Sequence, residues 1–319
     1  MLYKRRVNLA EIHIHKAGIL TTVQDLGRFG FQQYGMPVSG AMDMYSLKLA
    51  NSLVGNHLNE ACLEITAIGP TIEFDSDTFI AICGADMQAQ INGNDCEMYK
   101  TIEVKRGDVL SFKGLKNGFR TYIAFAGGID VPVVMGSKST YLRGKMGGFE
   151  GRALKNGDQL QLGKNSNKLE IKQISKEHIP EYKKSFIARI IPGPESNYFT
   201  VQALADFLKS EFVLSNHCDR MGYRLTGKTI MHKTTSEIIS SGIAFGTIQI
   251  PPNGEPIIMM ADRQTTGGYP RIATIISIDL PYLAQLQAGD MIRFREIRLE
   301  DAHELMREEQ ILWKSDTRI

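Results

Sequence analysis

The sequence predicts a mainly β protein with two lobes and a few short helices. Three observations support this prediction: the length of the chain, a series of short strand-like runs, and a turn pattern found in both halves. With 319 residues, the chain exceeds the roughly 250–300 residues at which a single hydrophobic core stops growing. We therefore expect two cores, and we place the lobes at residues 1–175 and 176–319.

Short runs of β-branched and alternating residues, separated by turn residues, predict the strands. In chain order they are TIEF, TFIAICGA, MQAQING, TIEVKRGDVLSF, FRTYIAFAGGI, GDQLQLG, ARIIPG and GTIQIPP. A Gly-Asp turn recurs in KRGDVL from Lys105, KNGDQL from Lys155 and QAGDMI from Gln287. Each turn leads into an alternating strand, as the hairpins of a barrel require. Its presence in both halves favours two related barrel lobes.

Helices are expected in three places. MDMYSLKLANSLVGN from Met42 has apolar residues at helical spacing and a glycine just past its end. SNYFTVQALADFLKS from Ser196 is a second helix, with a serine as its cap. Asp279 and Pro281 open a third, short one. The lysine-rich residues 163–186 have few large apolar side chains, so they are expected to link the lobes with a solvated surface.

Composition excludes several classes of function. Hydrophobic residues make up 43% of the chain and charged residues 23%, as in ordinary globular proteins. A net charge of +2 gives no electrostatic footprint for nucleic acid. No apolar run of about 18 residues and no signal-peptide core occur, so we expect no membrane span and a cytoplasmic location. The four cysteines lack CxxC spacing and are expected to be reduced thiols.

A metal site is not expected. His13 and His15 alternate within EIHIHKAGI and would face the same side of a strand. No third histidine, cysteine or paired carboxylate clearly joins them in the sequence, so we predict two exposed strand positions.

The most informative stretch is TVQDLGRFGFQQYGMPVSGAMD, residues 22–43. Its glycines let the backbone turn tightly or approach another group, while Asp25 and Arg28 stand among amide and aromatic side chains. A β-bulge or a barrel corner also uses glycine, and Asp25 with Arg28 can form a local ion pair. This stretch alone supports both interpretations equally. Four further stretches of the same character favour a ligand site.

The second stretch is GSKSTYLRGKMGGFEGRALKNGDQL, residues 136–160, which has six glycines and several basic residues, among them Arg143. Successive N–H groups of a glycine-rich loop can form a concavity for an anion, and arginine can bind a carboxylate or phosphate through two parallel hydrogen bonds. The stretch lacks the GxxxxGK[ST] order of a Walker loop. A solvated loop is equally compatible with its composition.

The remaining stretches are NHCDRMGYRLTG at 216–227, EIISSGIAFGTIQIPPNGEP at 237–256 and ADRQTTGGYPRIATI at 261–275. Together they offer carboxylates, guanidiniums, amides and hydroxyls, without a Ser-His-Asp order or a cysteine beside a histidine. This argues against covalent catalysis. Such a site suits the orientation of a polar small molecule and the stabilisation of charge on its oxygens.

These motifs resemble a known family. The stretches that carry the resemblance are LTTVQDLGRFGFQQYGMPVSGAMD, LEITAIGP, ICGAD, YIAFAGGIDVPVVMGSKSTYLRGKMGGFEGRALKNGD, CDRMGYRL, EIISSGIAFGTIQIPPNGEPIIMMADRQTTGGYPRIATI and AGDMIRF. They are similar to the KipA family, also called the PxpC family after the C subunit of 5-oxoprolinase, the biotin-dependent carboxyltransferase-like family or the allophanate hydrolase subunit 2-like family. The resemblance extends from about Lys16 to Phe294.

The resemblance implies a cyclophilin-like β-barrel architecture and a function in a heteromeric complex. The implied partners are a KipI-like protein, PxpB, and a third protein, PxpA, and the implied activity is ATP-dependent 5-oxoprolinase. In that scheme PxpB and PxpC activate the lactam oxygen of 5-oxoproline by phosphorylation, and PxpA completes hydrolysis to glutamate. ATP with Mg²⁺ would be shared with the partner protein.

Matching motifs then give hypotheses for individual residues. The arginines would bind phosphates and the substrate carboxylate, and the carboxylates would orient a metal-bound phosphate, shift a proton or only brace an arginine. The proposed catalytic residues are Asp25, Arg28, Arg143 and Glu237. The proposed substrate-binding residues are Ser39, Asp43, Arg220, Gln249, Gln264, Gly267 and Gly268.

Two other functions stay open. The carboxyltransferase half of urea carboxylase has the same two-part architecture, so the chain could move a carboxyl group from carboxybiotin to a small amide or amine. No AMKM-like carrier lysine occurs in the sequence, so biotin would arrive on another chain. Family members named KipA are also described as binding KipI and relieving its inhibition of a sensor kinase. The resemblance supports partner binding more firmly than it supports one reaction.

Overall fold

The computed structural model describes residues 10–165, 170–233 and 235–314. The chain forms two compact units. Among the described residues, the first unit comprises the chain up to Leu26 and Tyr45–Ile179, and the second comprises Gly27–Met44 and the chain from Pro180 onward. The predicted division lies between residues 175 and 176, whereas the units divide after Ile179 and residues 27–44 belong to the second unit.

The first unit contains two antiparallel sheets. The six-stranded sheet has the order β11-β1-β4-β9-β6-β7 and the five-stranded sheet the order β2-β3-β10-β5-β8. The strands of the first are β1 Glu11–Lys16, β4 Thr71–Phe74, β6 Ala89–Ile91, β7 Asn94–Asp95, β9 Val109–Phe112 and β11 Gln159–Gln161. The strands of the second are β2 Leu20–Gln24, β3 Cys62–Thr66, β5 Thr78–Asp86, β8 Thr101–Val104 and β10 Asn117–Phe125. Alternate apolar side chains such as Ile12, Ile72 and Ile82 form one buried core.

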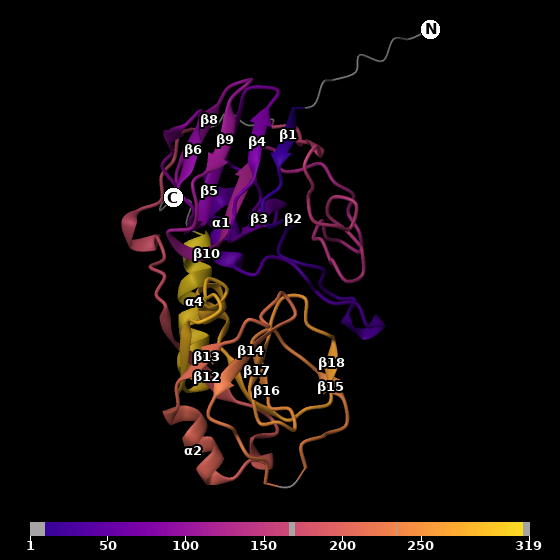
Figure 1. Cartoon of the computed structure of the whole chain (residues 1–319), viewed down its shortest axis with the longest axis vertical. Coiled ribbons are helices and arrows are strands. Elements are labelled where there is room, and N and C mark those ends of the chain that lie inside the picture. Colours follow the sequence, from indigo (N-terminus) through magenta and orange to yellow (C-terminus); the bar gives the residue numbers. More distant parts are fainter. Residues whose placement is uncertain (1–9, 166–169, 234, 315–319) are drawn as a thin grey trace. The chain divides into compact units, whose positions relative to one another are not determined.

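The second unit is built on a closed barrel of strand order β12-β19-β16-β17-β14-β13-β20 (Figure 1). The parallel pair β12 and β20 closes the barrel, and the other pairs are antiparallel. Its strands are β12 Ser185–Pro192, β13 Phe212–Leu214, β14 Gly222–Gly227, β16 Thr247–Gln249, β17 Ile257–Met259, β19 Arg271–Ile275 and β20 Met291–Glu296. A small sheet joins β15 Ser241–Gly242 to β18 Thr266–Gly267. The predicted β fold with a barrel is confirmed.

Four α-helices occur among the described residues: α1 Met44–Leu53, α2 Val201–Lys209, α3 Leu280–Leu283 and α4 Leu299–Lys314. The first three are confirmed predictions. The predicted serine cap of α2 is wrong, because Ser196 begins the short 3-10 helix η3 (Ser196–Tyr198) and Thr200 caps α2, accepting from the Ala203 N–H at 3.0 Å. The sequence does not predict α4, because this helix is strongly charged and buries only Ala302. The other 3-10 helices are η1 Gln32–Tyr34, η2 Lys176–His178 and η4 Ser277–Asp279.

The repeated Gly-Asp turn has the same geometry at all three positions. In each turn the aspartate carboxylate accepts a hydrogen bond from the N–H three residues earlier, at 2.7 Å for Asp108, 2.7 Å for Asp158 and 3.0 Å for Asp290. The glycine before it has a φ of 87° at Gly107, 90° at Gly157 and 89° at Gly289. Glycine adopts this left-handed region without steric cost, which explains the sequence repeat.

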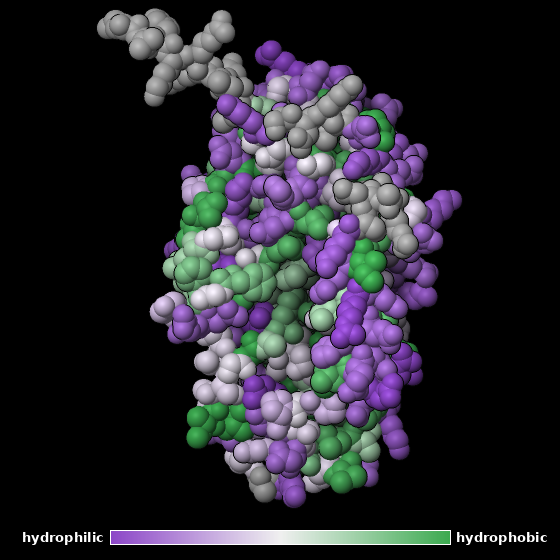
Figure 2. Space-filling view, turned by 180° about the vertical axis from the view of Figure 1, so that it is seen from behind, coloured by the Kyte–Doolittle hydropathy of each residue, from purple (hydrophilic) through white to green (hydrophobic). Residues whose placement is uncertain are grey.

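Hydrophilic residues are spread widely over the face in Figure 2, with hydrophobic residues among them. No helix in the described part of the chain combines the length and apolar content needed to cross a membrane. All four cysteines are free, as expected.

Candidate functional site

The structure brings five of the predicted site residues into the second unit as buried groups: Arg28, Ser39, Asp43, Arg220 and Gln249. They lie on segment 27–44, on the chain beside β14 and on β16. Three more predicted residues of this unit are exposed or half-buried around the small sheet, namely Gln264, Gly267 and Gly268, and Glu237 is exposed. Asp25 and Arg143 belong to the first unit.

Residues 37–43, the PVSGAMD end of the first motif, form a buried turn, which we call the Ser39 loop. Ser39 has a φ of 55° and Gly40 a φ of 85°, so two successive residues are left-handed. The Arg28 N–H donates to the Val38 carbonyl at 2.7 Å, so the segment folds back on itself here. A left-handed serine costs about 1–2 kcal/mol relative to the right-handed region and must be held by its surroundings.

Arg220 holds the Ser39 loop in place. Its Nη2 donates to the Gly40 carbonyl at 2.6 Å, and the same guanidinium pairs with Asp262 through Nε at 3.0 Å and Nη2 at 3.1 Å. The Asp262 N–H donates back to the Arg220 carbonyl at 2.7 Å. Both side chains are buried, and their charges compensate each other. Arg220 therefore supports the loop and has a carboxylate partner within the protein.

A second contact fixes the far end of the loop. Gln285, which follows α3, donates from Nε2 to the Asp43 carboxylate at 2.7 Å, and both side chains are buried. Sequence reasoning missed Gln285, because it lies between the predicted short helix opened by Asp279 and the QAGDMI turn from Gln287, and neither motif indicates a contact with Asp43. It also passed over Asp262, whose pairing with Arg220 spans 42 positions.

Asp25 anchors the glycine-rich stretch of the first unit. Its carboxylate accepts hydrogen bonds from the Ser137 hydroxyl at 2.7 Å, from the Lys138 N–H at 2.6 Å and from the Ser139 hydroxyl. Asp25 is buried, whereas Arg143 in the same stretch is exposed. The first and second motifs thus meet through Asp25, and the geometry gives this carboxylate a bracing contact with the glycine-rich stretch.

Gln249 and Gly267 depend on each other. The buried Gln249 side chain donates to the Tyr269 carbonyl at 3.1 Å. A Cβ on Gly267 would lie 2.7 Å from the Gln249 amide nitrogen, so any larger residue would displace this amide. Gly267, on β18, and Gln249 therefore pack closely together.

Arg263 is a buried cation that sequence reasoning did not select. Its Nε donates to the Ile243 carbonyl at 3.1 Å and its Nη1 to the Met260 carbonyl at 3.2 Å, and its guanidinium lies 5.5 Å from the centre of the Phe245 ring. Burial lowers the pKa of Arg263 to about 10, although the neighbouring Asp262 acts in the opposite direction. The sequence feature that could have identified Arg263 is its position between Asp262 and Gln264 in the polar stretch ADRQTT.

Two of the four cysteines, Cys62 and Cys96, have environments that disfavour the thiolate. Burial, with a smaller contribution from Glu60, raises the pKa of the Cys62 thiol well above its ordinary value. Burial also raises the pKa of Cys96 to about 11. Both thiols stay protonated near neutral pH.

One group of metal-ligating side chains lies on β1 and next to β4. Glu11, His13 and Asp75 place ligand atoms within 4.8 Å of one another. His15 instead contacts Glu73, with 2.6 Å between Nε2 and Oε2. Sequence reasoning therefore did not identify Glu73 and Asp75, the carboxylates that lie on or next to β4 and close to the histidines. The absence of a bound metal stays a prediction.

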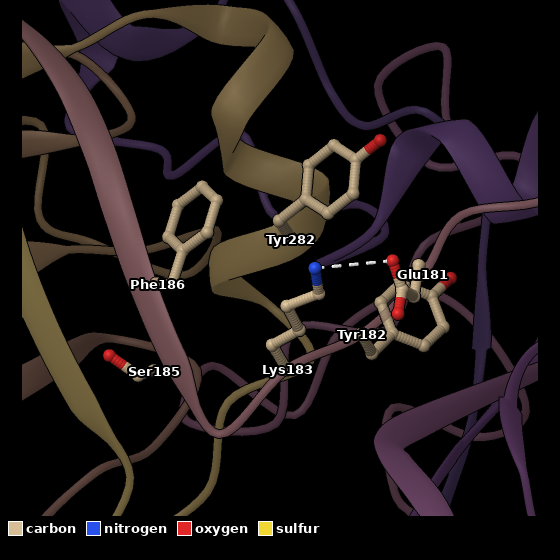
Figure 3. A pocket seen from close by; sticks show the side chains of 6 residues that line it. All are labelled: Glu181, Tyr182, Lys183, Ser185, Phe186 and Tyr282. Atoms are coloured by element: carbon tan, nitrogen blue, oxygen red, sulfur yellow. Dashed lines mark ion pairs between the residues drawn. The ribbon is translucent and has the colours of Figure 1, made fainter.

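A hollow of about 310 Å³ lies elsewhere in the second unit (Figure 3). The Tyr282 ring stacks on Phe186 at 5.8 Å and meets Tyr182 edge-on at 6.4 Å. Lys183 pairs with Glu181 at 3.2 Å, and both side chains are largely exposed. None of the predicted site residues lines this hollow, and its charges are matched, so the Ser39 loop is the stronger candidate site.

Comparisons with known proteins place the chain among relatives of two kinds. Residues 34–296 match the family described as "Carboxyltransferase domain, subdomain A and B". The chain is 42% identical over 308 residues to the C subunit of 5-oxoprolinase from Escherichia coli, covering 95% of this chain and 98% of that protein. It is 38% identical to the C subunit of 5-oxoprolinase from Haemophilus influenzae, covering 91% and 92%. The crystal structure of Kluyveromyces lactis urea carboxylase matches with a TM-score of 0.90 at 31% identity, covering 96% of this chain and 29% of that chain.

Proposed function

The chain belongs to the carboxyltransferase domain family with subdomains A and B, and from this we propose that it is the PxpC component of an ATP-dependent 5-oxoprolinase complex. The observation that carries the proposal is the similarity to the 5-oxoprolinase C subunit of E. coli, which spans nearly the full length of both chains. An end-to-end match supports the same role in a complex more strongly than a match to one domain of a larger enzyme.

In the proposed reaction, the chain acts with a KipI-like PxpB and with PxpA in the cytoplasm. The lactam oxygen of 5-oxoproline takes the γ-phosphoryl group of ATP, and ADP leaves. Water then adds to the activated ring carbon on PxpA, the C–N bond opens, and glutamate and phosphate are released. ATP is a cosubstrate shared with PxpB, and Mg²⁺ would neutralise its phosphates.

In this scheme, different residues contact the phosphate, bind the substrate and position the Ser39 loop. Arg143 is exposed on the glycine-rich stretch that Asp25 anchors, so it is suited to phosphate oxygens brought by the partner. The Ser39 loop of the second unit is suited to the small substrate. Arg220 and Asp43 act as positioning residues for that loop. Arg28 and the exposed Glu237 keep their proposed catalytic roles as hypotheses.

The test is reconstitution of the three proteins, with glutamate and ADP measured from 5-oxoproline while each one is left out in turn. We expect ATP-dependent turnover only with all three. Arg143→Ala should assemble normally and lower kcat/KM by about 100-fold, the scale for one transition-state charge contact. Lys155→Ala, at another exposed position of the same stretch, is the matched control and should keep wild-type turnover. Full activity of the Arg143 variant would exclude the proposed role of this guanidinium.

The structural match to urea carboxylase favours one alternative, a carboxyltransferase that receives carboxybiotin from a separate carrier chain. A complex that forms with PxpB but yields no glutamate, and instead carboxylates a small amide from a carboxybiotin carrier, would establish this alternative. A complex that forms and catalyses neither reaction would point to the regulatory role of a KipI-binding partner.

A further inference from the structure

The Ser39 loop carries unused hydrogen-bond donors. The backbone N–H groups of Ser39, Gly40 and Ala41 donate to no residue in the described parts of the chain. The Ser39 hydroxyl likewise has no hydrogen-bond partner there, although Ser39 is only 1% exposed. Gly40 and Ala41 are buried as well. Buried N–H groups without partners are rare in folded proteins, so four donors in three consecutive residues indicate a missing acceptor.

The backbone of the loop turns sharply at these donors. Ser39 has a φ of 55° and Gly40 a φ of 85°, and successive N–H groups in a turn can form a concavity that binds an anion. The Gly40 carbonyl cannot rotate into this concavity, because Arg220 holds it at 2.6 Å. Gln285 fixes the end of the same turn through Asp43.

The charges around the loop limit what it binds. Arg220 is compensated by Asp262, and Asp43 contributes a carboxylate bound to Gln285. The donors themselves are neutral dipoles. Backbone N–H groups bind carboxylates and phosphates alike, but the Asp43 carboxylate at the end of the loop repels a doubly charged phosphate more strongly than a singly charged carboxylate. The loop therefore suits one carboxylate.

We propose that the N–H groups of Ser39, Gly40 and Ala41, together with the Ser39 hydroxyl, bind the carboxylate of the substrate. For the proposed reaction, on which this inference rests, the ligand is the α-carboxylate of 5-oxoproline. The carboxylate fixes the lactam ring, so the reacting oxygen lies at a constant position relative to the phosphoryl donor. Ser39 is then a specificity residue, and Arg220 and Gln285 are positioning residues.

The test compares two ligands on the assembled complex of this chain with PxpB. Dissociation constants are measured by calorimetry for 5-oxoproline and for its carboxamide, which keeps the lactam and lacks the negative charge. Wild type is expected to bind the acid more tightly. Ser39→Ala should weaken acid binding about 10-fold or more, as expected for a hydrogen bond to a charged group, and leave carboxamide binding within about 2-fold. The preference for the acid should fall accordingly.

Two further variants keep the test decisive. Ala67 adopts a φ of 59° in this chain, so alanine is compatible with the backbone at Ser39, and Ser39→Gly provides the same deletion without strain if the alanine variant fails to assemble. Ser52→Ala is the matched control, because the Ser52 hydroxyl bonds only to the Leu49 carbonyl of its own helix at 2.7 Å. An unchanged preference in both Ser39 variants, or equal binding of the two ligands by wild type, overturns the inference.

Turnover separates this inference from the proposed function. If the wild-type complex with PxpA forms glutamate but the Ser39 variants keep the acid preference, only the carboxylate site is wrong. If wild type binds the acid preferentially through Ser39 and forms no glutamate, the proposed function fails and the carboxylate site stands.

Discussion

Arg220 lies at a position where its hydrogen bonds account for both its charge and its orientation. It pairs with Asp262 at 3.0 Å and supports the Gly40 carbonyl at 2.6 Å. The planar guanidinium donates to the Asp262 carboxylate and the Gly40 carbonyl at the same time. A lysine ammonium group lacks this rigid fork of donors. Arg220 therefore uses a guanidinium that is already fixed by Asp262 to hold the Ser39 loop in one conformation.

Removal of this side chain should be costly. Arg220→Ala leaves the Asp262 carboxylate buried without its partner, and breaking such a pair costs about 3–5 kcal/mol. Urea unfolding should show this loss in the second unit. Arg224→Ala, at a nearby but exposed position on β14, is the control and should change the free energy of unfolding by less than about 0.5 kcal/mol. Equal stability of the two variants would contradict the assigned role of Arg220.

Glu195 supplies a residue-scale prediction about pH. The hydrogen bond from Arg271, at 2.6 Å between Nε and Oε2, lowers the pKa of Glu195, while partial burial opposes the shift. A carboxyl whose pKa is lower in the folded state stabilises the fold above its unfolded pKa of about 4.3. This stability is lost as the pH falls from that value through the lower folded-state pKa of Glu195, because the unfolded state binds the proton more readily in this range.

The measurement is the urea midpoint of the second unit between about pH 7 and pH 3. The Glu195→Gln variant should be less stable near neutral pH and should lose less stability on acidification than wild type. Glu308→Gln, at an exposed position of α4, should follow the wild-type curve. Parallel curves for wild type and Glu195→Gln would show that the Arg271 contact does not shift this carboxyl.

At the scale of elements, the contribution of the Gly-Asp turn can be tested by comparing a glycine in one such turn, Gly289, with a glycine outside these turns, Gly242. Gly289 has a φ of 89° and open space where a Cβ would stand, whereas Gly242 has the same open space without a positive φ. Gly289→Ala should therefore cost about 1–2 kcal/mol through backbone conformation alone. Gly242→Ala should stay within about 0.5 kcal/mol of wild type in urea unfolding. Similar costs at both positions would rule out the left-handed turn as the reason for the repeat.

Elements with a local signature were predictable from the sequence. β10 and β5 are runs of β-branched and aromatic residues, and α1 has the apolar spacing of a helix. α4 escaped prediction because it buries only Ala302 and has no apolar face that stands out from its charged residues. The cap of α2 depended on where η3 ends, which propensity does not determine.

The candidate site was predictable in residue type and less so in contacts. Ser39, Asp43 and Arg220 stand in polar, glycine-containing motifs, and the structure places all three around one loop. Their partners Asp262 and Gln285 come from distant motifs. Such pairings follow from the barrel topology, and no local pattern in the sequence encodes them.

At the scale of the whole molecule, the second unit is assembled from two separate parts of the chain. Met42, on segment 27–44, is fully buried in the core of the barrel unit with residues such as Phe212 and Ile258. Met42→Ala should therefore destabilise the second unit by about 2–5 kcal/mol, the usual range for a buried methionine. Its position early in the sequence gives no indication of this.

Hydrogen exchange measured by mass spectrometry locates the effect. Met42→Ala should reduce protection in the barrel strands β12 to β20 more than in the sheets of the first unit. Met306→Ala, at a position 37% exposed on α4, should leave the protection of both units nearly unchanged. A loss of protection confined to the first unit would contradict the assignment of segment 27–44.

The divided chain of the second unit has a consequence for biosynthesis. Segment 27–44 leaves the ribosome before residues 45–179 of the first unit and well before the barrel strands from β12 onward. The first unit can fold as soon as its own sheets are complete, since domains fold as units during synthesis. Met42 and the Ser39 loop then stay without their packing partners, joined covalently to a folded first unit, until Arg220 and Gln285 have been synthesised. Translation order thus makes the Ser39 loop one of the last parts of the protein to be ordered.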